Sequence, residues 1–409
     1  MKSLPIAGEP PPPRAHGGAT YSYGLWATGF RPFFLVAAAI AVVLVPLWLL
    51  VLGGSLPPTT TYLTPMGWHA HEMVFGFACA VVAGFLLTAV RNWTQRETAT
   101  GAALAGLAAL WGLGRLVITV RFGLPGAVVA IIDLAFLPAL ALAIARPIAA
   151  SGNRRSYAMI VVLALLFATN LAVHLDALGV VSGWQLRATH AAVIVLALLA
   201  AIIAGRVIPT FTRNATGSTR IVSVAWLDRA AVAAIAAHLV FELAAPLSLP
   251  ATVAAGLAGV LVLARAARWG AGASLRTPLL WILHAGHAWI GIGFALRVAA
   301  MMTTRISTTA GTHALTVGAI GTLTLGMMAR VSLGHTGRSL VLRPITVAAF
   351  VLVTLAAVLR VFGPVLAANA LAYPTWLALS ATAWAAAFAL FLVAYVRVLT
   401  SPRADGKPG

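Results

Sequence analysis

The sequence is poor in charged residues and almost free of cysteine. Only 9% of its 409 residues are charged and 61% are hydrophobic, whereas soluble domains carry about 25% charged residues. This composition excludes an ordinary water-soluble domain. The single cysteine, Cys79, excludes an intramolecular disulfide and a metal cluster held by several thiolates. For a soft metal, histidine imidazoles are therefore the obvious ligands.

Acidic residues are also scarce. Eight Asp and Glu stand against 27 Lys and Arg, which gives a formal net charge of +19. The arginines are spaced between apolar runs and form no single basic patch, so we expect no nucleic-acid partner. The sequence has no Gly-rich phosphate loop, HExxH helix or GxSxG elbow, and nothing in it supports an ATPase or hydrolase function.

Long apolar runs are what the sequence has in quantity. About 20 apolar residues are needed to cross a bilayer core of about 30 Å. We therefore predict an all-α polytopic membrane protein of about 12 transmembrane helices, with a single transmembrane domain over residues 31–400 in contact with the lipid bilayer. The predicted spans are 32–53, 68–91, 100–119, 126–145, 157–177, 185–208, 226–244, 249–267, 277–300, 309–330, 343–363 and 372–396.

The distribution of arginine predicts the orientation of these spans. Lys and Arg collect on the cytoplasmic side of membrane proteins. The connections after the second, fourth, sixth, eighth and tenth spans carry arginine, and those after the first, fifth and seventh carry none. An even number of spans with both termini in the cytoplasm fits this alternation. Residues 1–30 are then a largely disordered cytoplasmic tail, and residues 401–409 are a cytoplasmic C-terminal tail.

Three histidines indicate an internal repeat. His71, His190 and His313 lie near the starts of the second, sixth and tenth predicted spans, 119 and 123 residues apart. This spacing predicts three repeats of four helices, and membrane proteins built from repeats commonly place the functional site at the repeat interface. The alternative is a chance alignment, because few other positions match.

Histidine is the residue type that points to chemistry. Ionisable residues inside a membrane are costly and are functional by default hypothesis. Haem needs one or two axial imidazoles and a copper site two or three, so the ten histidines suffice for both. Any one of them alone is better explained as a hydrogen-bonded structural residue, but all of them together at one level are not. Two of them, three residues apart on the ninth span, share a helix face: His284 and His287. Six project from the periplasmic halves of their helices: His69, His71, His174, His190, His238 and His313.

Acidic and basic residues near these histidines are candidates for supporting roles. Glu72, beside His71, and Glu242, one turn beyond His238, are expected to accept an imidazole N–H or to carry protons, or else to pair with arginine at a helix end. Asp133, within the fourth span, is a weaker candidate for a proton path. Three arginines near the periplasmic boundary are candidates to pair haem propionates or to snorkel: Arg115, Arg187 and Arg297.

Several sequence motifs resemble the NnrS family over nearly the whole chain. They are residues 29–34 (GFRPFF), 68–77 (WHAHEMVFGF) continuing to 84–94 (GFLLTAVRNWT), 205–214 (GRVIPTFTRN) and 327–338 (MMARVSLGHTGR). The resemblance implies a bacterial inner-membrane protein that contains haem, expected to be haem b, and copper, and that is linked to nitric oxide in denitrification or nitrosative-stress defence. Arg206 and Arg330, inside these motifs, are expected to support the site or a proton path. The motif histidines correspond here to His69, His71, His190, His284, His313 and His335, and His287 stands where that pattern is often aromatic.

These observations lead to a first hypothesis for function. We expect a haem and copper protein that binds or turns over nitric oxide and receives electrons from a redox partner or quinol. His71 and His313 are the expected haem ligands, and His190 with His238 or His284 is expected near copper. The haem signal should then be lost in His71→Ala but not in His174→Ala. The alternatives are a proton-coupled transporter of a small molecule and a non-catalytic subunit for electron transfer or metal delivery.

Overall fold

The structure is a computed structural model and describes residues 24–57, 62–366 and 372–407. Helices are its only regular elements across these three stretches, and no strand occurs in them, as the apolar runs predict. Residues 1–23 of the predicted N-terminal tail lie outside the described residues.

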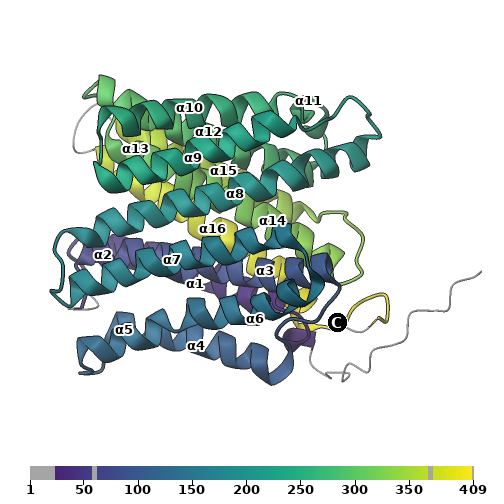
Figure 1. The fold of residues 1–409 in the computed structure, drawn as a ribbon, viewed down its shortest axis with the longest axis horizontal. Helices are drawn as coiled ribbons and strands as arrows, with labels where there is room; N and C mark the ends of the chain where they lie inside the picture. The colour runs from purple at the N-terminus through teal and green to yellow at the C-terminus, as the bar shows by residue number, and fades with distance from the viewer. Residues whose placement is uncertain (1–23, 58–61, 367–371, 408–409) are drawn as a thin grey trace, which may run out of the picture.

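The helices follow one another through short connections (Figure 1). Four of the membrane-crossing segments combine more than one helical element. The elements α2, η2 and α3 run on as one, as do η3 with α7 and α13 with η4 and α14, and α5 and α6 are separated only by Ala135. The elements are η1 Gly24–Trp26, α1 Phe30–Leu52, α2 Pro65–His71, η2 Glu72–Ala78, α3 Cys79–Thr94, α4 Gly101–Val120, α5 Gly126–Leu134, α6 Phe136–Ser151, η3 Arg154–Ser156, α7 Tyr157–Ala177, α8 Trp184–Thr216, α9 Ala225–Ala244, α10 Leu249–Ala266, α11 Ala271–Ser274, α12 Pro278–Met302, α13 Thr308–His313, η4 Ala314–Gly321, α14 Thr322–Gly334, α15 Pro344–Leu366 and α16 Ala372–Thr400.

Eleven helical segments of the described chain are long and apolar enough to cross a membrane. The chain is therefore a polytopic membrane protein. The remaining predicted span, 226–244, corresponds to α9, whose 20 residues include Asp228, Arg229 and Glu242. The helix α9 packs alongside both α8 and α10 and runs along them despite its charges (Figure 1).

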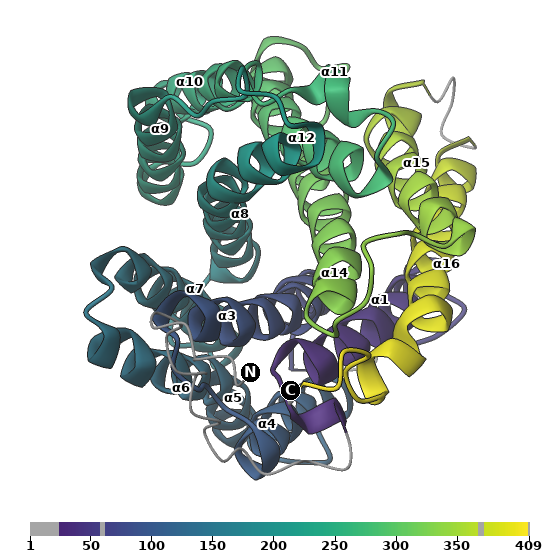
Figure 2. The ribbon, with the colours of Figure 1, turned by 90° about the vertical axis from the view of Figure 1, so that its right-hand side faces the viewer.

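Three helical segments form the centre of the bundle. They are Pro65–Thr94, Trp184–Thr216 and Thr308–Gly334, in which 89%, 67% and 72% of the most apolar window is buried inside the protein, more than in any of the other candidate spans. Figure 2 shows α3, α8 and α14 around the middle of the molecule, with the other helices grouped outside them. These central segments are the ones that carry His71, His190 and His313, so the histidines of the predicted repeat lie on the most enclosed helices.

Glycine allows two of the central helices to approach their neighbours closely. A Cβ on Gly84 would lie 2.9 Å from the Phe34 ring, and a Cβ on Gly326 would lie 2.8 Å from Ile282. Small residues at such crossings are typical of helix packing in membranes, where close van der Waals contact replaces the hydrophobic effect.

Two central segments contain a stretch of π-helix. The first, η2, begins directly after His71, and the second, η4, begins directly after His313. In a π-helix each N–H bonds a carbonyl five residues earlier, and such stretches are uncommon and frequently lie at functional sites. The local backbone therefore marks the same two histidines that the residue spacing indicated.

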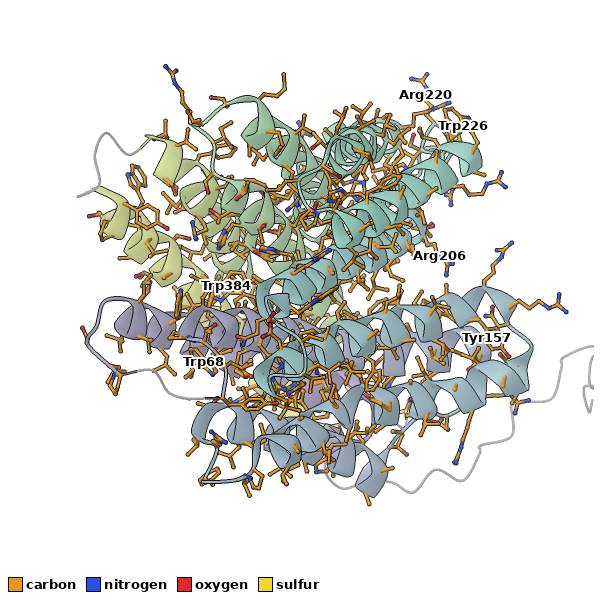
Figure 3. The ribbon with its side chains drawn as sticks, turned by 60° about the vertical axis from the view of Figure 1, so that its left-hand side comes forward. Trp68, Tyr157, Arg206, Arg220, Trp226 and Trp384 are labelled. Carbon is orange, nitrogen blue, oxygen red and sulfur yellow. The ribbon has the colours of Figure 1, made fainter. Side chains whose placement is uncertain are left out.

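The two ends of the bundle differ in composition. Arg206, Arg220, Tyr157 and Trp226 lie towards one end, and Trp68 lies towards the other (Figure 3). The helices α2 and α13, which end in His71 and His313, are at the end opposite to α11 (Figure 1). This separation agrees with the arginine-rich loops lying on one side of the membrane.

The first and last helices close the bundle. The buried guanidinium of Arg31 in α1 donates to the carbonyl oxygens of Leu399 at 3.0 Å and Ser401 at 2.7 Å. The indole Nε1 of Trp384 in α16 donates to the carbonyl of Ala41 in α1 at 3.1 Å. As a result α1 and α16 lie side by side (Figure 2).

Candidate metal centre

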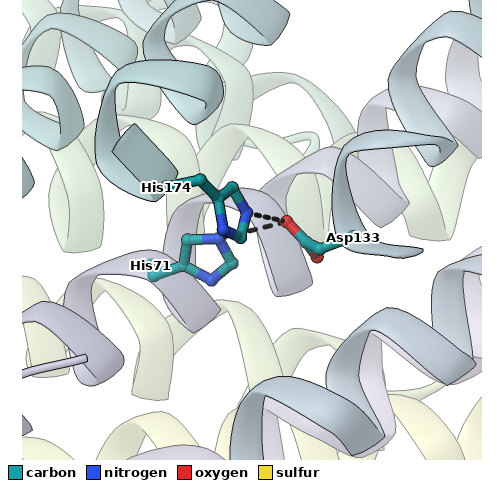
Figure 4. Close-up of side chains that lie close together, drawn as sticks. All are labelled: His71, Asp133 and His174. Carbon is teal, nitrogen blue, oxygen red and sulfur yellow. Dashed lines mark hydrogen bonds and ion pairs between the residues drawn. The ribbon is translucent and has the colours of Figure 1, made fainter. Parts of the chain in front are cut away.

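A cluster of three buried side chains lies between α2, α5 and α7. His71, Asp133 and His174 each offer one ligand atom, and these atoms lie within 4.8 Å of one another. The Oδ2 atom of Asp133 is 2.9 Å from Nε2 of His174 and 3.3 Å from Nε2 of His71 (Figure 4). None of the three residues is more than 2% exposed. The cluster is thus closed to bulk water and centred on one carboxylate.

The local structure explains why these residues meet. His71 is the last residue of α2, immediately before the π-helical stretch, and His174 lies in the last turn of α7. Asp133 lies next to the end of α5, where Ala135 interrupts the helix. Three element ends therefore converge, and each carries a polar side chain into the bundle.

Asn170 and Tyr62 complete the hydrogen bonding of the cluster. Asn170, one turn before His174 on α7, donates through Nδ2 to Asp133 Oδ2 at 2.8 Å and places its Oδ1 atom 3.0 Å from His71 Nε2. The Tyr62 hydroxyl is 2.8 Å from Nδ1 of His174. Partners of this kind fix the orientation of imidazole and carboxylate ligands at metal sites.

An arginine holds the two carboxylates of the region. The Arg115 guanidinium forms ion pairs with Asp133 and with Glu72, the latter at 2.6 Å. Glu72 Oε1 is also 3.2 Å from His71 Nδ1. Glu72 therefore contacts both an imidazole and an arginine.

The charges of this cluster do not balance if both imidazoles are neutral. Asp133 and Glu72 bring two negative charges, and Arg115 brings one positive charge. An unmatched charge buried at this depth is costly. One additional positive charge, either a proton or a bound metal cation, would make the cluster neutral.

The hydrogen-bond partners of His71 also indicate a missing positive charge. Its Nδ1 atom faces Glu72 Oε1, and its Nε2 atom faces Asn170 Oδ1 and Asp133 Oδ2. All three are acceptors as the structure places them, whereas a neutral imidazole carries only one N–H. By contrast, His174 is satisfied as a neutral ring that donates from Nε2 to Asp133 and accepts from Tyr62 at Nδ1. A cation beside His71 Nε2 would be bound by this nitrogen and by the oxygens that face it, Asn170 Oδ1 and Asp133 Oδ2.

The donor set fits a transition-metal ion. Two imidazole nitrogens and one carboxylate oxygen are ligands for zinc, copper, manganese and non-haem iron, and three protein ligands leave positions open for a small molecule. The sequence lacks the thiolates that would favour an iron–sulfur cluster, since Cys79 is its only cysteine. The cluster could therefore hold one metal ion.

His69 and His313, two of the other predicted histidines, lie outside this cluster. The His69 ring stacks on Trp48 with centroids 4.7 Å apart, whereas His71 points into the cluster. Nδ1 of His69 is buried with no hydrogen-bond partner among the described residues. His313 bonds the Thr309 carbonyl through Nδ1 at 2.7 Å, and its electrostatic neighbours include His69 and His190.

His238 has the arrangement of a ligand whose second nitrogen is anchored. Its Nδ1 donates to the Ala251 carbonyl at 2.9 Å, and its Nε2 is buried without a partner in the described part of the chain. Glu242, one turn beyond, forms an ion pair with Arg297. Both charges are electrostatic neighbours of His190 as well, so His190 and His238 share one polar surrounding. The partner that the structure gives Glu242 is thus an arginine.

His284 and His287 share a helix but bond to different neighbouring helices. Nε2 of His284 is 3.0 Å from the Thr212 hydroxyl on α8. Nε2 of His287 donates to the Val262 carbonyl on α10 at 3.2 Å, and its ring lies 4.7 Å from that of Trp269. The Nε2 atoms of His284 and His287 therefore bond to different groups on different helices.

The remaining motif residues lie away from the cluster. His335 follows the end of α14, and its carbonyl accepts from Arg403 at 3.0 Å. Arg330 lies over the Phe211 ring at 3.6 Å, and Arg206 is exposed. Arg187 donates to the carbonyls at the end of α9 and stacks on Trp184.

Two members of the cluster were not singled out as ligands from the sequence. His174 was expected to be dispensable for haem, and Asp133 was considered only for proton transfer. One signal was present: Asn170 and His174 are four residues apart in an apolar helix, which places both on one face. What the sequence does not contain is the contact of that face with Asp133, 41 residues from His174.

Comparison with known proteins gives one family match. The family model described as NnrS protein matches residues 24–403. No curated protein matches the chain.

Proposed function

The chain belongs to the NnrS protein family, and from this premise we propose that it holds a redox-active metal ion at His71, Asp133 and His174 and binds or turns over nitric oxide there. The observation that carries the proposal is the buried cluster whose carboxylates outnumber its guanidinium by one. Copper is the metal of choice, because imidazole suits it and the family resemblance implies it.

The location of the cluster suits an uncharged gas. Nitric oxide is small and carries no charge, so it dissolves in the apolar interior of a membrane more readily than an ionic substrate. A bound redox metal would supply an open coordination position and the change of oxidation state that conversion of nitric oxide requires.

The side chains around the metal ligands have distinct tasks in this proposal. Asn170 and Tyr62 hold the two imidazoles in orientation, and Arg115 fixes the outer oxygen of Asp133. Packing of α2, α5 and α7 excludes water, which strengthens every electrostatic interaction inside the site. The chain thus provides a dry, oriented and negatively charged pocket for a cation.

We also propose that haem b is held by histidines of the central helices. His313, with Nδ1 bonded to a backbone carbonyl, keeps the Nε2 lone pair for a metal. Buried Nδ1 of His69, which has no partner among the described residues, is a second candidate, and His190 a third. In this proposal the protein lies in a bacterial inner membrane and receives electrons from a quinol or a redox partner.

Metal analysis of purified protein tests the proposal directly. We expect about one non-haem metal ion per chain in the wild type and its loss in His71→Ala, Asp133→Asn and His174→Ala. His287→Phe is the matched control, because it removes an imidazole that bonds only a backbone carbonyl and should keep the metal. Visible spectra, reduced and with nitric oxide added, report on haem independently.

The outcome separates the competing functions. If the three variants retain the metal of the wild type, the assignment of the ligands is wrong. A wild-type protein with neither metal nor a haem Soret band removes the redox proposal and favours the transporter alternative. A six-coordinate haem that does not react with nitric oxide favours an electron-transfer subunit.

A further inference from the structure

An apolar cavity of about 100 Å³ lies among the central helices. It is bounded by α1, η2 with α3, α8, α12 and η4 with α14. Val81, Leu199 and Leu323, one from each central segment, are among the residues that line it. The cavity is thus formed where the three segments of the predicted repeat meet.

The lining has almost no polar group that could hydrogen-bond to water. Thr324 is the one residue of the lining with a polar side chain, and its hydroxyl already donates to the Gly321 carbonyl at 3.0 Å. A buried water typically needs two to four polar partners, and apolar cavities of about 150 Å³ stay dry and bind benzene or xenon. This cavity is therefore suited to a small apolar occupant.

The cavity begins close to the histidines of all three central segments. Ala78 and Ile320, both in its lining, are seven residues after His71 and His313 and lie in the two π-helical stretches. Leu196, also in the lining, is six residues after His190. Each central helix thus carries a histidine and, about two turns further along, a wall of the cavity.

The cavity is partly open to the surface of the bundle. Ala78, Leu199 and Leu283 in its lining are buried, whereas Phe85, Ala200 and Met327 are partly exposed. An occupant can therefore reach the cavity past the partly exposed residues.

We infer that this cavity takes up an uncharged diatomic gas and holds it about two helical turns from His71 and His313. That the gas is nitric oxide rests on the proposed function, but occupancy by a small apolar molecule does not. The volume of about 100 Å³ admits such a molecule and is smaller than the cavity of about 150 Å³ that accommodates one benzene.

Xenon is the probe for the cavity itself. The full-length protein in lipid nanodiscs, equilibrated with xenon under pressure, should show one bound xenon between Val81, Leu199 and Leu323, by structure determination or by xenon NMR. Ala200→Phe, which places a ring in the lining, should abolish this xenon, and Ala200→Leu serves if the larger residue prevents folding. Ala109→Phe adds the same ring at an exposed position of α4 and should leave xenon binding unchanged.

Nitric oxide kinetics test the role of the cavity. Ala200→Phe should slow nitric oxide association by about tenfold with metal content unchanged, while Ala109→Phe associates at the wild-type rate. Xenon that binds equally in Ala200→Phe, or an acyl chain filling the cavity in the nanodisc structure, overturns the inference. If the protein holds no metal, xenon binding still decides whether the cavity accepts a gas, so the two proposals fail separately.

Discussion

Asp133 is the residue on which both imidazoles of the cluster depend. Asp133→Asn keeps the shape of the side chain but removes the charge that attracts a cation, so metal content should fall to near zero. Asp133→Asn should be less stable than the metal-loaded wild type by about 1–3 kcal/mol, because the variant lacks both the bound cation and one of the two carboxylate partners of Arg115. Labelling of the single buried Cys79 by a thiol-reactive dye during heating measures the unfolding. Unchanged metal content in Asp133→Asn would contradict the proposed site.

His174 now carries a prediction that was not drawn from the sequence, because the structure places it at the non-haem metal site. The Nε2 atom of His174 lies 2.9 Å from Asp133 Oδ2, the same oxygen that faces His71. His174→Ala should therefore lose the non-haem metal as completely as His71→Ala does. The haem spectrum of His174→Ala should persist, since the haem is proposed at other histidines. Metal analysis and absorption spectra of the same sample measure both, and retention of the metal would return His174 to a structural role.

Tyr62, which lies outside the membrane-spanning helices, links the cluster to pH. Burial raises the pKa of Tyr62 to about 12, while the charge of Arg121 acts in the opposite direction. Because the folded pKa is above the unfolded value of about 10, the stabilisation that comes from the protonated hydroxyl is complete below pH 10. It is lost as the pH rises from there through about 12.

Tyrosinate absorbance measures this shift. The difference between the titrations of the wild type and Tyr62→Phe should show one group with a pKa of about 12. Tyr62→Phe should also weaken metal binding, because His174 Nδ1 loses its hydrogen-bond donor. A difference spectrum with a midpoint near 10 would show instead that the hydroxyl is solvated.

For single residues, the sequence predicts which side chains belong to a site better than it predicts which residues they contact. His71 and Glu72 stand out because ionisable groups are rare in apolar runs, and the structure places both at the cluster. The contacts of His71 with Asn170 and Asp133 span 99 and 62 residues. Such contacts depend on how helices tilt and rotate against one another, which hydrophobic periodicity does not encode.

At the scale of elements, the approach of α4 to α5 holds the carboxylate in place. A Cβ on Gly114 would lie 2.9 Å from Asp133 Oδ1. Gly114→Ala should therefore displace the carboxylate, reduce metal content and cost about 1–3 kcal/mol of stability. Gly112→Ala, on the same helix with nothing within 4 Å of the added Cβ, should keep the metal and be neutral or stabilising by up to about 1 kcal/mol. Equal behaviour of the two variants would contradict a steric role for Gly114.

The elements also show where prediction from apolar runs stops. Segment positions follow from hydrophobicity, and the predicted span 68–91 lies inside Pro65–Thr94. The π-helical stretches after His71 and His313 were not predicted, because an apolar run looks the same whether its backbone bonds four or five residues back. The break at Ala135, which brings Asp133 to a helix end, was missed for the same reason.

At the scale of the whole molecule, orientation in the membrane is open to direct measurement. The proposed topology puts the connection at residues 178–183 outside and the connection at residues 217–224 in the cytoplasm. The helix α9 then crosses from residues 217–224 back to an outer connection at residues 245–248. An impermeant maleimide should label Val180→Cys and Leu247→Cys in spheroplasts, and Ser218→Cys only after permeabilisation. Both substituted hydrophobic residues are exposed, and Cys79 is buried and stays unlabelled. Labelling of Ser218→Cys but not Val180→Cys in spheroplasts would reverse the orientation.

The arrangement of the whole bundle was predictable only in outline. Residues that span the membrane are apolar on every side, so composition does not tell which helices are central. The spacing of His71, His190 and His313 did single out the segments that the structure places in the centre. The closing contact of α1 with α16 had no such signal.

That closing contact has a consequence for how the protein is made. The acceptors of the enclosed Arg31 side chain at Leu399 and Ser401 lie 368 and 370 residues downstream, so they are still untranslated when the first helix enters the translocon. Insertion of α1 must precede its final partners by nearly the whole synthesis. A chain released before α16 is made would leave the Arg31 guanidinium without these two carbonyl acceptors, and membrane chaperones and proteases could recognise it. Docking of the last helix thus completes the assembly of the protein.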